Sequence, residues 1–135
     1  MQKVDTYYRG SHCKYKLTMH TVLVTKYRRK LLYGKLDNDL KKIICELANE
    51  NDWHIQILET DGDHIHILLD YKQYESVSDV VKILKQQSTY RIWQLHPELK
   101  RNYWKRNIFW SGGYFACSIG DASNETIRKY IEEQG

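Results

Sequence analysis

The sequence predicts a single α+β domain over residues 1–135, with a ferredoxin-like, RRM-like split βαβ architecture. The apolar residues alternate between strand spacing and helix spacing in the order β-α-β-β-α-β-α. The length of 135 residues suits one domain, and the chain has one proline and no linker rich in glycine or serine. We therefore expect a central antiparallel sheet with two helices on one face and an extra C-terminal helix.

The first strand and the first helix have the clearest local signals. Residues 15–25 are apolar and β-branched, which favours a strand. Residues 36–50 are expected to form a helix, with Asp37 as a plausible cap. The apolar residues of this helix recur at helical spacing and should face the sheet: Leu36, Leu40, Ile43, Ile44, Leu47 and Ala48.

A β-hairpin is expected next. Residues 53–59 alternate in polarity as a strand does, and residues 64–70 form a second such run. The link between the two runs, Thr60-Asp61-Gly62-Asp63, has the composition of a turn. The two strands should therefore pair directly with each other.

The C-terminal half supplies a second helix, a fourth strand and a last helix. Ser76 or Ser78 caps the second helix, with Asp79 placed as in a capping box, and this helix runs to about residue 95. Its apolar face consists of Val77, Val80, Val81 and Leu84. A strand is expected at residues 114–119, followed by a helix at residues 124–134 that Asp121 or Ser123 caps.

Composition and charge exclude several classes of protein. No apolar stretch approaches the ~20 residues of a membrane span, and the N-terminus lacks the apolar core of a signal peptide. Three scattered cysteines form neither a disulfide framework nor a Cys-x-x-Cys zinc pair, and we expect Cys45 and Cys117 to be buried thiols. The expected location is the cytoplasm, without a membrane partner.

Two segments combine cations with aromatic residues. Residues 26–30 form a compact basic run that contains Lys26, Arg28 and Arg29, and residues 100–106 include Tyr103, Trp104, Lys105 and Arg106. Aromatic faces next to cations suit single-stranded nucleic acid, because its unpaired bases can stack. A solvated turn and core aromatics are the alternative explanation, which the net charge of +4 does not exclude.

The segment His64-Ile65-His66 is the candidate metal site. In a strand, side chains alternate between faces, so His64 and His66 stand together opposite Ile65, Ile67 and Leu69. Two neutral imidazoles side by side make half of a metal site, although a structural pair of histidines is the alternative. His20 is expected to support these ligands, and Asp63 could orient an imidazole or serve the turn.

The last helix carries a second candidate pair. Tyr130 and Gln134 are spaced i, i+4 and therefore share one face of the helix. A phenol is a possible nucleophile, and a carboxamide oxygen is a ligand for a hard divalent ion. The alternative is that Tyr130 is a half-buried aromatic residue on an amphipathic helix with Ile127 and Ile131.

The ordered set of these segments resembles the small single-tyrosine HUH transposases of the TnpA type, which serve insertion sequences that move as single-stranded DNA. The resemblance covers the chain from about Lys16 to Gln134. It rests on the order of the elements and on four segments: Lys26–Arg29, Asp63–Leu68, Trp110–Phe115 and Lys129–Gln134.

The resemblance implies a site and a reaction. His64, His66 and Gln134 would bind one divalent metal ion, Mg²⁺ or Mn²⁺, and Tyr130 would attack the scissile phosphate to give a 5′-phosphotyrosine and a free 3′-OH. The choice of metal rests on the resemblance, because imidazoles alone suit zinc equally well. The partners would be single-stranded DNA with subterminal hairpins and a second copy of the chain as a homodimer.

The resemblance also implies a DNA-associated prokaryotic protein that needs no nucleotide cofactor, in agreement with the absence of a glycine-rich phosphate loop. Lys26, Arg28, Arg29, Lys105 and Arg106 are then expected to contact DNA.

Two other functions remain as alternatives. A catalytically retired RRM-like module would bind single-stranded or hairpin nucleic acid without cleaving it, although the chain retains Tyr130, Gln134 and both histidines. The other alternative is a different phosphoesterase, of which two kinds can be compared with the sequence. One of the two-histidine-motif class would need a second His-x-Thr/Ser motif, which the sequence lacks. A histidine-triad hydrolase would need a third alternating histidine at position 68, where Leu68 stands.

Overall fold

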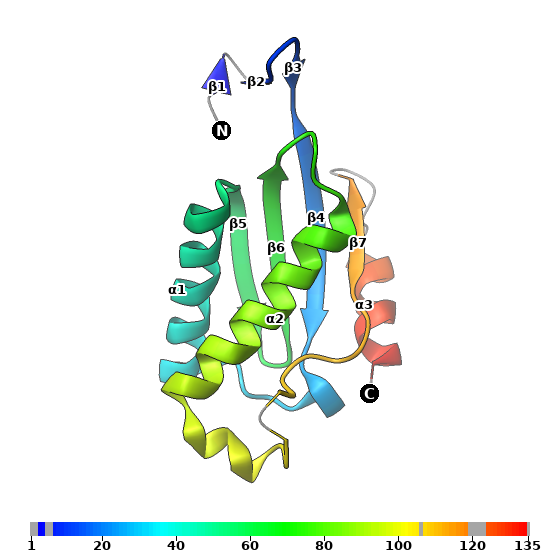
Figure 1. The fold of residues 1–135 in the computed structure, drawn as a ribbon. Coiled ribbons are helices and arrows are strands. Elements are labelled where there is room, and N and C mark those ends of the chain that lie inside the picture. The colour runs from blue at the N-terminus through cyan, green and yellow to red at the C-terminus, as the bar shows by residue number, and fades with distance from the viewer. Residues whose placement is uncertain (1–2, 5–6, 106, 119–123, 135) are drawn as a thin grey trace.

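The computed structural model describes residues 3–4, 7–105, 107–118 and 124–134. A four-stranded antiparallel sheet has the strand order β5-β6-β4-β7, which is that of a split βαβ fold. Two helices cover one face of the sheet, and a third helix lies on the other face behind β7 (Figure 1). The elements are β4 (Leu17–Val24), α1 (Gly34–Asn51), β5 (His54–Asp61), β6 (His64–Tyr71), α2 (Val77–Leu95), β7 (Phe115–Ser118) and α3 (Asn124–Glu133). The predicted fold class is confirmed.

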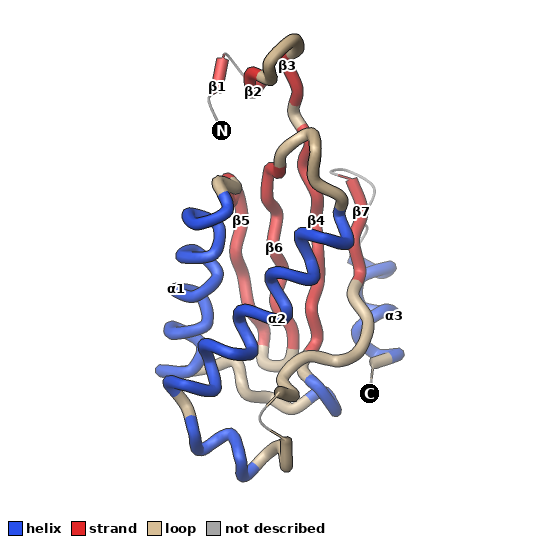
Figure 2. Tube along the Cα trace, viewed as in Figure 1, coloured by secondary structure: helices blue, strands red, loops and turns tan. Residues whose placement is uncertain are grey.

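The hairpin between β5 and β6 is tighter than the sequence predicted. Thr60 pairs with Ile65 and Asp61 pairs with His64, so only Gly62 and Asp63 lie between the strands. Figure 2 shows the short loop that joins β5 to β6 at one end of the sheet. Gly62 adopts a φ of 66°, a left-handed conformation that glycine reaches without strain. The longer pairing places Asp61 beside the first histidine.

The core lies between the sheet and the helices α1 and α2. Ile65, Ile67 and Leu69 of β6 are fully buried there, as their alternation predicted. The helices contribute the predicted apolar residues. Ile92 and Trp93, in the C-terminal half of α2, are also buried, although the predicted apolar face of this helix ended at Leu84. Cys45 was expected to be buried but is exposed, because α1 turns Ile43, Ile44 and Leu47 toward the sheet and Cys45 away from it. Cys117 is only partly buried.

The predicted cap of α2 is correct, and the predicted cap of α1 is wrong. The Ser76 hydroxyl accepts a hydrogen bond from the Asp79 backbone N–H at 3.1 Å, so Ser76 caps α2 as predicted. Asp37 does not cap α1, because the helix already begins at Gly34. Its carboxylate instead accepts a hydrogen bond from the Thr60 hydroxyl at 2.6 Å, which ties α1 to the end of β5.

A small sheet near the N-terminus was not predicted. It consists of β1 (Lys3–Val4), β2 (Tyr7–Arg9) and β3 (Lys14–Tyr15), in that order. The Tyr8 hydroxyl donates to the carboxylate of the buried Asp70 on β6, which also accepts hydrogen bonds from Thr18 and Gln56 at 2.6 and 2.7 Å. Because a buried carboxylate is costly without partners, this cluster holds the small sheet against the main one.

Helix α3 packs on the face of the sheet that α1 and α2 leave free. Ile127 and Ile131 contact Val22 and Val24 of β4, with Phe115 and Tyr130 beside them. The proposed caps of this helix, Asp121 and Ser123, lie outside the described residues, as does the DNA-binding candidate Arg106. Among the described residues, no helix combines the length and the apolar character that a membrane crossing needs.

We predict that Tyr8→Phe lowers the free energy of unfolding by about 1–3 kcal/mol, because it removes a hydrogen bond to a buried carboxylate. Urea denaturation at neutral pH measures this change. Tyr7→Phe is the matched control, since Tyr7 is the exposed neighbour in the same strand. Equal stability of the two variants would show that the bond between Tyr8 and Asp70 contributes nothing.

Candidate active site

Three histidines gather on the sheet face that carries α3, here called the open face. His64 and His66 point to this face because their neighbours Ile65 and Ile67 are committed to the core. In the register of the sheet, Val24 lies opposite His64 and Val22 lies opposite His66. The sequence therefore placed both histidines correctly.

A cavity of about 500 Å³ lies between this part of the sheet and α3, and we call it the histidine cavity. His64 and His66 line it together with groups of both charges. The cations are Arg28, Lys30 and Arg128, and the carboxylates are Asp61, Asp63 and Glu132. Because cations attract a phosphate and carboxylates attract a metal ion, this mixture suits chemistry on a phosphodiester.

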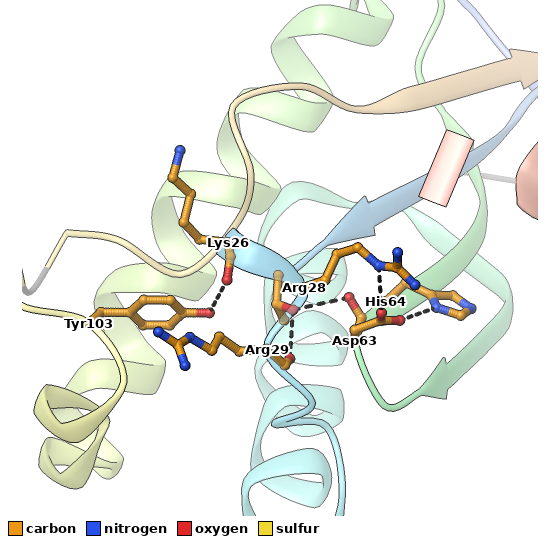
Figure 3. Close-up of polar contacts among 7 residues, drawn as sticks. Lys26, Arg28, Arg29, Asp63, His64 and Tyr103 are labelled. Atoms are coloured by element: carbon orange, nitrogen blue, oxygen red, sulfur yellow. Dashed lines mark hydrogen bonds and ion pairs between the residues drawn. The ribbon is translucent and has the colours of Figure 1, made fainter. Parts of the chain in front are cut away.

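Asp63 joins His64 to Arg28 (Figure 3). One carboxylate oxygen lies 2.8 Å from Nδ1 of His64, and the other accepts a hydrogen bond from Nε of Arg28 at 3.2 Å. Burial would raise the pKa of Asp63, but the hydrogen bonds from His64 and Arg28 outweigh it, so the pKa falls below its ordinary value. Asp63 is therefore an anion at neutral pH and can accept from both neighbours.

His20 of β4 lies against His66. The Nε2 atom of His20 is 3.3 Å from Nδ1 of His66, and the two rings stack with centroids 5.5 Å apart. Burial lowers the pKa of His20, and burial followed by the charges of the neighbouring histidines lowers the pKa of His66. Both imidazoles are thus kept neutral at pH 7, which is the state that binds a metal ion.

The segment after β4 has an unusual backbone. Tyr27 and Arg28 have φ values of 61° and 51° within the short helix η1 (Lys26–Arg28). Non-glycine residues reach this region at a cost of about 1–3 kcal/mol each. Hydrogen bonds hold the segment: the Tyr103 hydroxyl donates to the Lys26 carbonyl at 2.9 Å, and the Thr25 hydroxyl donates to the Arg29 carbonyl at 2.7 Å. The strained turn carries Arg28 to Asp63.

Three other DNA-binding candidates, Lys26, Arg29 and Lys105, lie beside exposed aromatic rings. The Tyr27 ring is 56% exposed, with the Lys26 ammonium 5.4 Å and the Arg29 guanidinium 5.8 Å from its centre. Trp104 is 78% exposed, and the Lys105 ammonium lies 4.5 Å from the centre of its ring. Both rings are therefore open to a flat partner and flanked by positive charge.

Tyr130 and Gln134 are not among the described residues of α3 that line the histidine cavity. Gln134 Oε1 accepts a hydrogen bond from the Ser111 hydroxyl at 3.2 Å. The Tyr130 hydroxyl is buried without a hydrogen-bond partner among the described residues, near Gly113. Burial raises the pKa of Tyr130, and the nearby Ser111 hydroxyl opposes this effect only partly.

The helix places Tyr130 away from the charged residues of α3 that line the cavity. Ile127 and Ile131 face the sheet and line the histidine cavity together with Arg128 and Glu132. Tyr130 is two residues from each of Arg128 and Glu132, which is more than half a helical turn. The structure therefore brings His64 and His66 together, while a joint site with Tyr130 and Gln134 stays a prediction.

Lys85 of α2 supports the segment that holds Tyr130, a role that the sequence did not indicate. Its ammonium donates to the carbonyls of Ser111 and Gly113 at 2.8 and 3.2 Å. Burial and then the charge of Lys26 lower the pKa of Lys85. No local pattern could identify this role, since the partners lie 26 and 28 residues away.

A larger cavity, of about 800 Å³, lies along α2 and is lined by Lys85, Tyr90, Trp93 and Trp110 among others. No imidazole or carboxylate is among its described lining residues. Size alone does not make a site, and the groups that can bind a metal or move a proton are in the histidine cavity. We therefore take the histidine cavity as the candidate active site.

The two histidines of the histidine cavity are suitable ligands for a divalent metal ion, but such an ion would need at least one further ligand. His64 and His66 supply two imidazoles whose Nδ1 atoms already have partners. Within the described part of the chain, no three His, Cys, Asp or Glu side chains are grouped closely enough to hold a metal ion. A further ligand of another type, such as the carboxamide of Gln134, is consistent with this finding.

Comparison with known sequences gives one consistent result. Residues 13–134 match the family described as "Transposase IS200 like". The chain is 32% identical over 126 residues to the ISDra2 transposase TnpA of Deinococcus radiodurans, which covers 93% of this chain and 89% of that protein. It is also 32% identical over 127 residues to the transposase for insertion sequence element IS200 of Salmonella typhimurium, over 92% of this chain and 80% of that protein.

Solved structures agree with the sequences. A crystal structure described as a transposase from Deinococcus radiodurans superposes with a TM-score of 0.86 at 31% identity, over 93% of this chain and 96% of that one. A REP-associated tyrosine transposase bound to a REP hairpin superposes with a TM-score of 0.56 at 15% identity, over 92% of this chain and 69% of that one. The second likeness concerns the fold alone.

We predict that Tyr130 ionises above pH 10 in the free protein, because burial raises its pKa. A raised pKa stabilises the fold at pH values below 10, and this contribution is lost as the pH rises through the folded-state pKa. Tyrosine labelled with ¹³C at Cζ reports ionisation by NMR, and comparison with Tyr130→Phe identifies the resonance. A midpoint at or below pH 10 would contradict the burial of this phenol.

Proposed function

Because the chain belongs to the IS200-like transposase family, we propose that it cleaves and rejoins single-stranded DNA through a covalent bond to Tyr130. The observation that carries the proposal is the histidine cavity, in which His64 and His66 meet both cations and carboxylates. Such a site can receive a phosphodiester and hold a divalent ion beside it. Tyr130 is the proposed nucleophile because of its place on α3 and its match to the family's tyrosine motif.

The proposed reaction is a displacement at phosphorus. The Tyr130 phenol loses its proton to solvent, and its oxygen forms a bond to the scissile phosphorus. The bond from phosphorus to the 3′ oxygen breaks, and that oxygen takes up a proton to become a free 3′-OH. The 5′ end stays attached as a phosphotyrosine, so a second 3′-OH can reverse the step and rejoin a strand without a nucleotide cofactor.

The proposed ligands of the metal ion are His64, His66 and Gln134. A bound Mg²⁺ or Mn²⁺ would neutralise the charge of the phosphate and orient it for displacement in line. Arg28, whose Nε is engaged by Asp63, keeps other guanidinium N–H groups with which to contact the same phosphate.

We propose that Tyr130 acts in the histidine cavity of a second copy of the chain. In its own chain the Tyr130 hydroxyl is buried beside Gly113, and the α3 residues that line the histidine cavity include Arg128 and Glu132 but not Tyr130. A neutral phenol with a raised pKa is a poor nucleophile, so this position suits a resting state. A homodimer that exchanges α3 would bring Tyr130 and Gln134 to the partner's histidines.

The proposed DNA partner has subterminal hairpins next to single-stranded segments. A related fold has been solved with a hairpin, which supports hairpin recognition in this chain. The exposed rings of Tyr27 and Trp104, with Lys26, Arg29 and Lys105 beside them, offer stacking surfaces to unpaired bases. A protein that acts on chromosomal and excised DNA in this way is proposed to work in the cytoplasm of a prokaryote.

We predict that Tyr130→Phe still binds hairpin DNA but forms no covalent adduct. A labelled single-stranded oligonucleotide with a hairpin, incubated with Mn²⁺, reveals the adduct by denaturing gel electrophoresis. Tyr114→Phe is the control, since Tyr114 is a partly exposed tyrosine close to β7 that should leave the adduct intact. An adduct in Tyr130→Phe would contradict the assignment, and binding without any adduct in the wild type would favour the retired binding module.

We predict that the double variant Lys26→Gln/Arg29→Gln binds single-stranded DNA more weakly and with less dependence on salt. Two lost phosphate contacts should reduce the slope of log K against log salt by about 1.4. Fluorescence anisotropy between roughly 50 and 200 mM salt measures the slope. Lys35→Gln/Lys42→Gln, which removes the same charge from exposed positions of α1, is the control, and equal slopes for the two double variants would contradict the proposed surface.

A further inference from the structure

The Nδ1 atoms of both histidines in the cavity have partners from the protein. Nδ1 of His64 lies 2.8 Å from an oxygen of Asp63, and Nδ1 of His66 lies 3.3 Å from Nε2 of His20. A histidine that binds a metal ion through one nitrogen normally has the other held by a hydrogen bond, which fixes the tautomer and the direction of the ring. Only the Nε2 atoms of His64 and His66 are thus left for a ligand in the cavity.

We infer that Asp63 and His20 are positioning residues, which hold His64 and His66 with their protons on Nδ1 and so offer both Nε2 atoms to one divalent ion. The inference rests on the proposed function in that it assigns these histidines to a metal ion. Neither Asp63 nor His20 would bind the metal ion or the DNA itself. Each would act through the imidazole beside it.

The surroundings of Asp63 fix its carboxylate in place. Asp63 is 6% exposed, and its backbone carbonyl accepts hydrogen bonds from the N–H of Thr25 at 2.9 Å and from the Thr25 hydroxyl at 3.2 Å. Arg28 donates to the carboxylate oxygen that His64 does not use. Because an ionised carboxylate can only accept, the proton between Asp63 and His64 belongs to Nδ1 of the histidine.

The strained turn explains how Arg28 reaches this position. Tyr27 and Arg28 both adopt left-handed conformations, and the chain then turns back so that the guanidinium points to Asp63 (Figure 3). Strain of this kind persists only where surrounding contacts impose it, and it is common at functional sites. The turn joins a basic residue of the proposed DNA surface to the support of His64.

His20 is placed as a support and not as a third ligand. It lies on the central strand β4, whose residue Val22 pairs with His66, so its ring reaches His66 diagonally across the sheet. Its Nε2 atom faces Nδ1 of His66, and His20 is not among the residues that line the histidine cavity. In the inferred arrangement, His66 donates its Nδ1 proton and His20 Nε2 accepts it.

The first test is the tautomer of each histidine in the metal-free wild-type protein. Long-range ¹H–¹⁵N correlation spectra distinguish a proton on Nδ1 from one on Nε2 and require no variant that might alter the fold. The expected result is a proton on Nδ1 of both His64 and His66 at neutral pH. A proton on Nε2 of either histidine would overturn the inference for that residue.

The second test is the affinity for Mn²⁺, measured by electron paramagnetic resonance without DNA. Asp63→Asn should weaken Mn²⁺ binding about tenfold or more, because His64 and Arg28 use different oxygens of Asp63 and the amide replaces one of them with an NH₂ donor. His20→Phe should weaken it by a similar factor, since the phenyl ring fills the same space but accepts no hydrogen bond. Asp61→Asn is the matched control, as it removes the same charge from the same cavity and hairpin.

The outcomes separate this inference from the proposed function. A loss for Asp63→Asn and His20→Phe well beyond that for Asp61→Asn supports the positioning roles. Equal losses for the two aspartate variants would show that Asp63 acts only through its charge, and would overturn its positioning role while the metal site stands. Failure of the wild-type protein to bind Mn²⁺ would overturn the proposed metal site and this inference with it.

Discussion

The alternation of side chains along β6 is the constraint on which the rest of the structure depends. Ile65, Ile67 and Leu69 fill the core beneath α1 and α2, and a shift of one residue would place them in solvent. Burial of such side chains stabilises a fold by about 1.5–3 kcal/mol each, so the register is strongly held. The same register fixes His64 and His66 on the open face. The position of the candidate site is therefore a consequence of packing on the opposite side of the sheet.

The docking of α3 is the second determinant, and it decides which functional groups meet. Ile127 and Ile131 contact Val22 and Val24, so the helix can turn only one side toward the histidines. That side carries Arg128 and Glu132, while the hydroxyl of the partly buried Tyr130 lies near Gly113. The packing raises the pKa of the Tyr130 phenol through burial, and it leaves Tyr130 outside the described lining of the cavity. This arrangement is the physical basis for the proposal that the tyrosine acts in a partner's site.

Local patterns in the sequence correctly predicted features that depend on residues close together in the chain. The strand period of residues 64–70 and the cap at Ser76 belong to this class, and the structure confirms both. Asp37 failed as a cap because a glycine three residues earlier already allows α1 to begin. The small N-terminal sheet was missed because its strands are two or three residues long, and the bond between Tyr8 and Asp70 that holds it joins residues 62 positions apart.

In the candidate site, too, local sequence pattern predicted some features, and others depend on tertiary contacts. The sequence identified His64 and His66 through their spacing, and it named Asp63 and His20 as potential supports. It could not choose between a turn role and a support role for Asp63, because that choice depends on the left-handed turn at Tyr27 and Arg28. The contact between His20 and His66 depends on the pairing of β4 with β6. Such contacts follow from tertiary structure and not from local pattern.

The most direct test of this account is complementation between two inactive variants. Tyr130→Phe subunits retain the histidines, and His64→Ala/His66→Ala subunits retain the tyrosine. If Tyr130 acts in the partner's cavity, mixing equal amounts restores one site in each mixed dimer, or about a quarter of the wild-type cleavage of single-stranded DNA. A mixture that forms mixed dimers and stays inactive would contradict the account, because the tyrosine and the histidines would then have to come from the same chain.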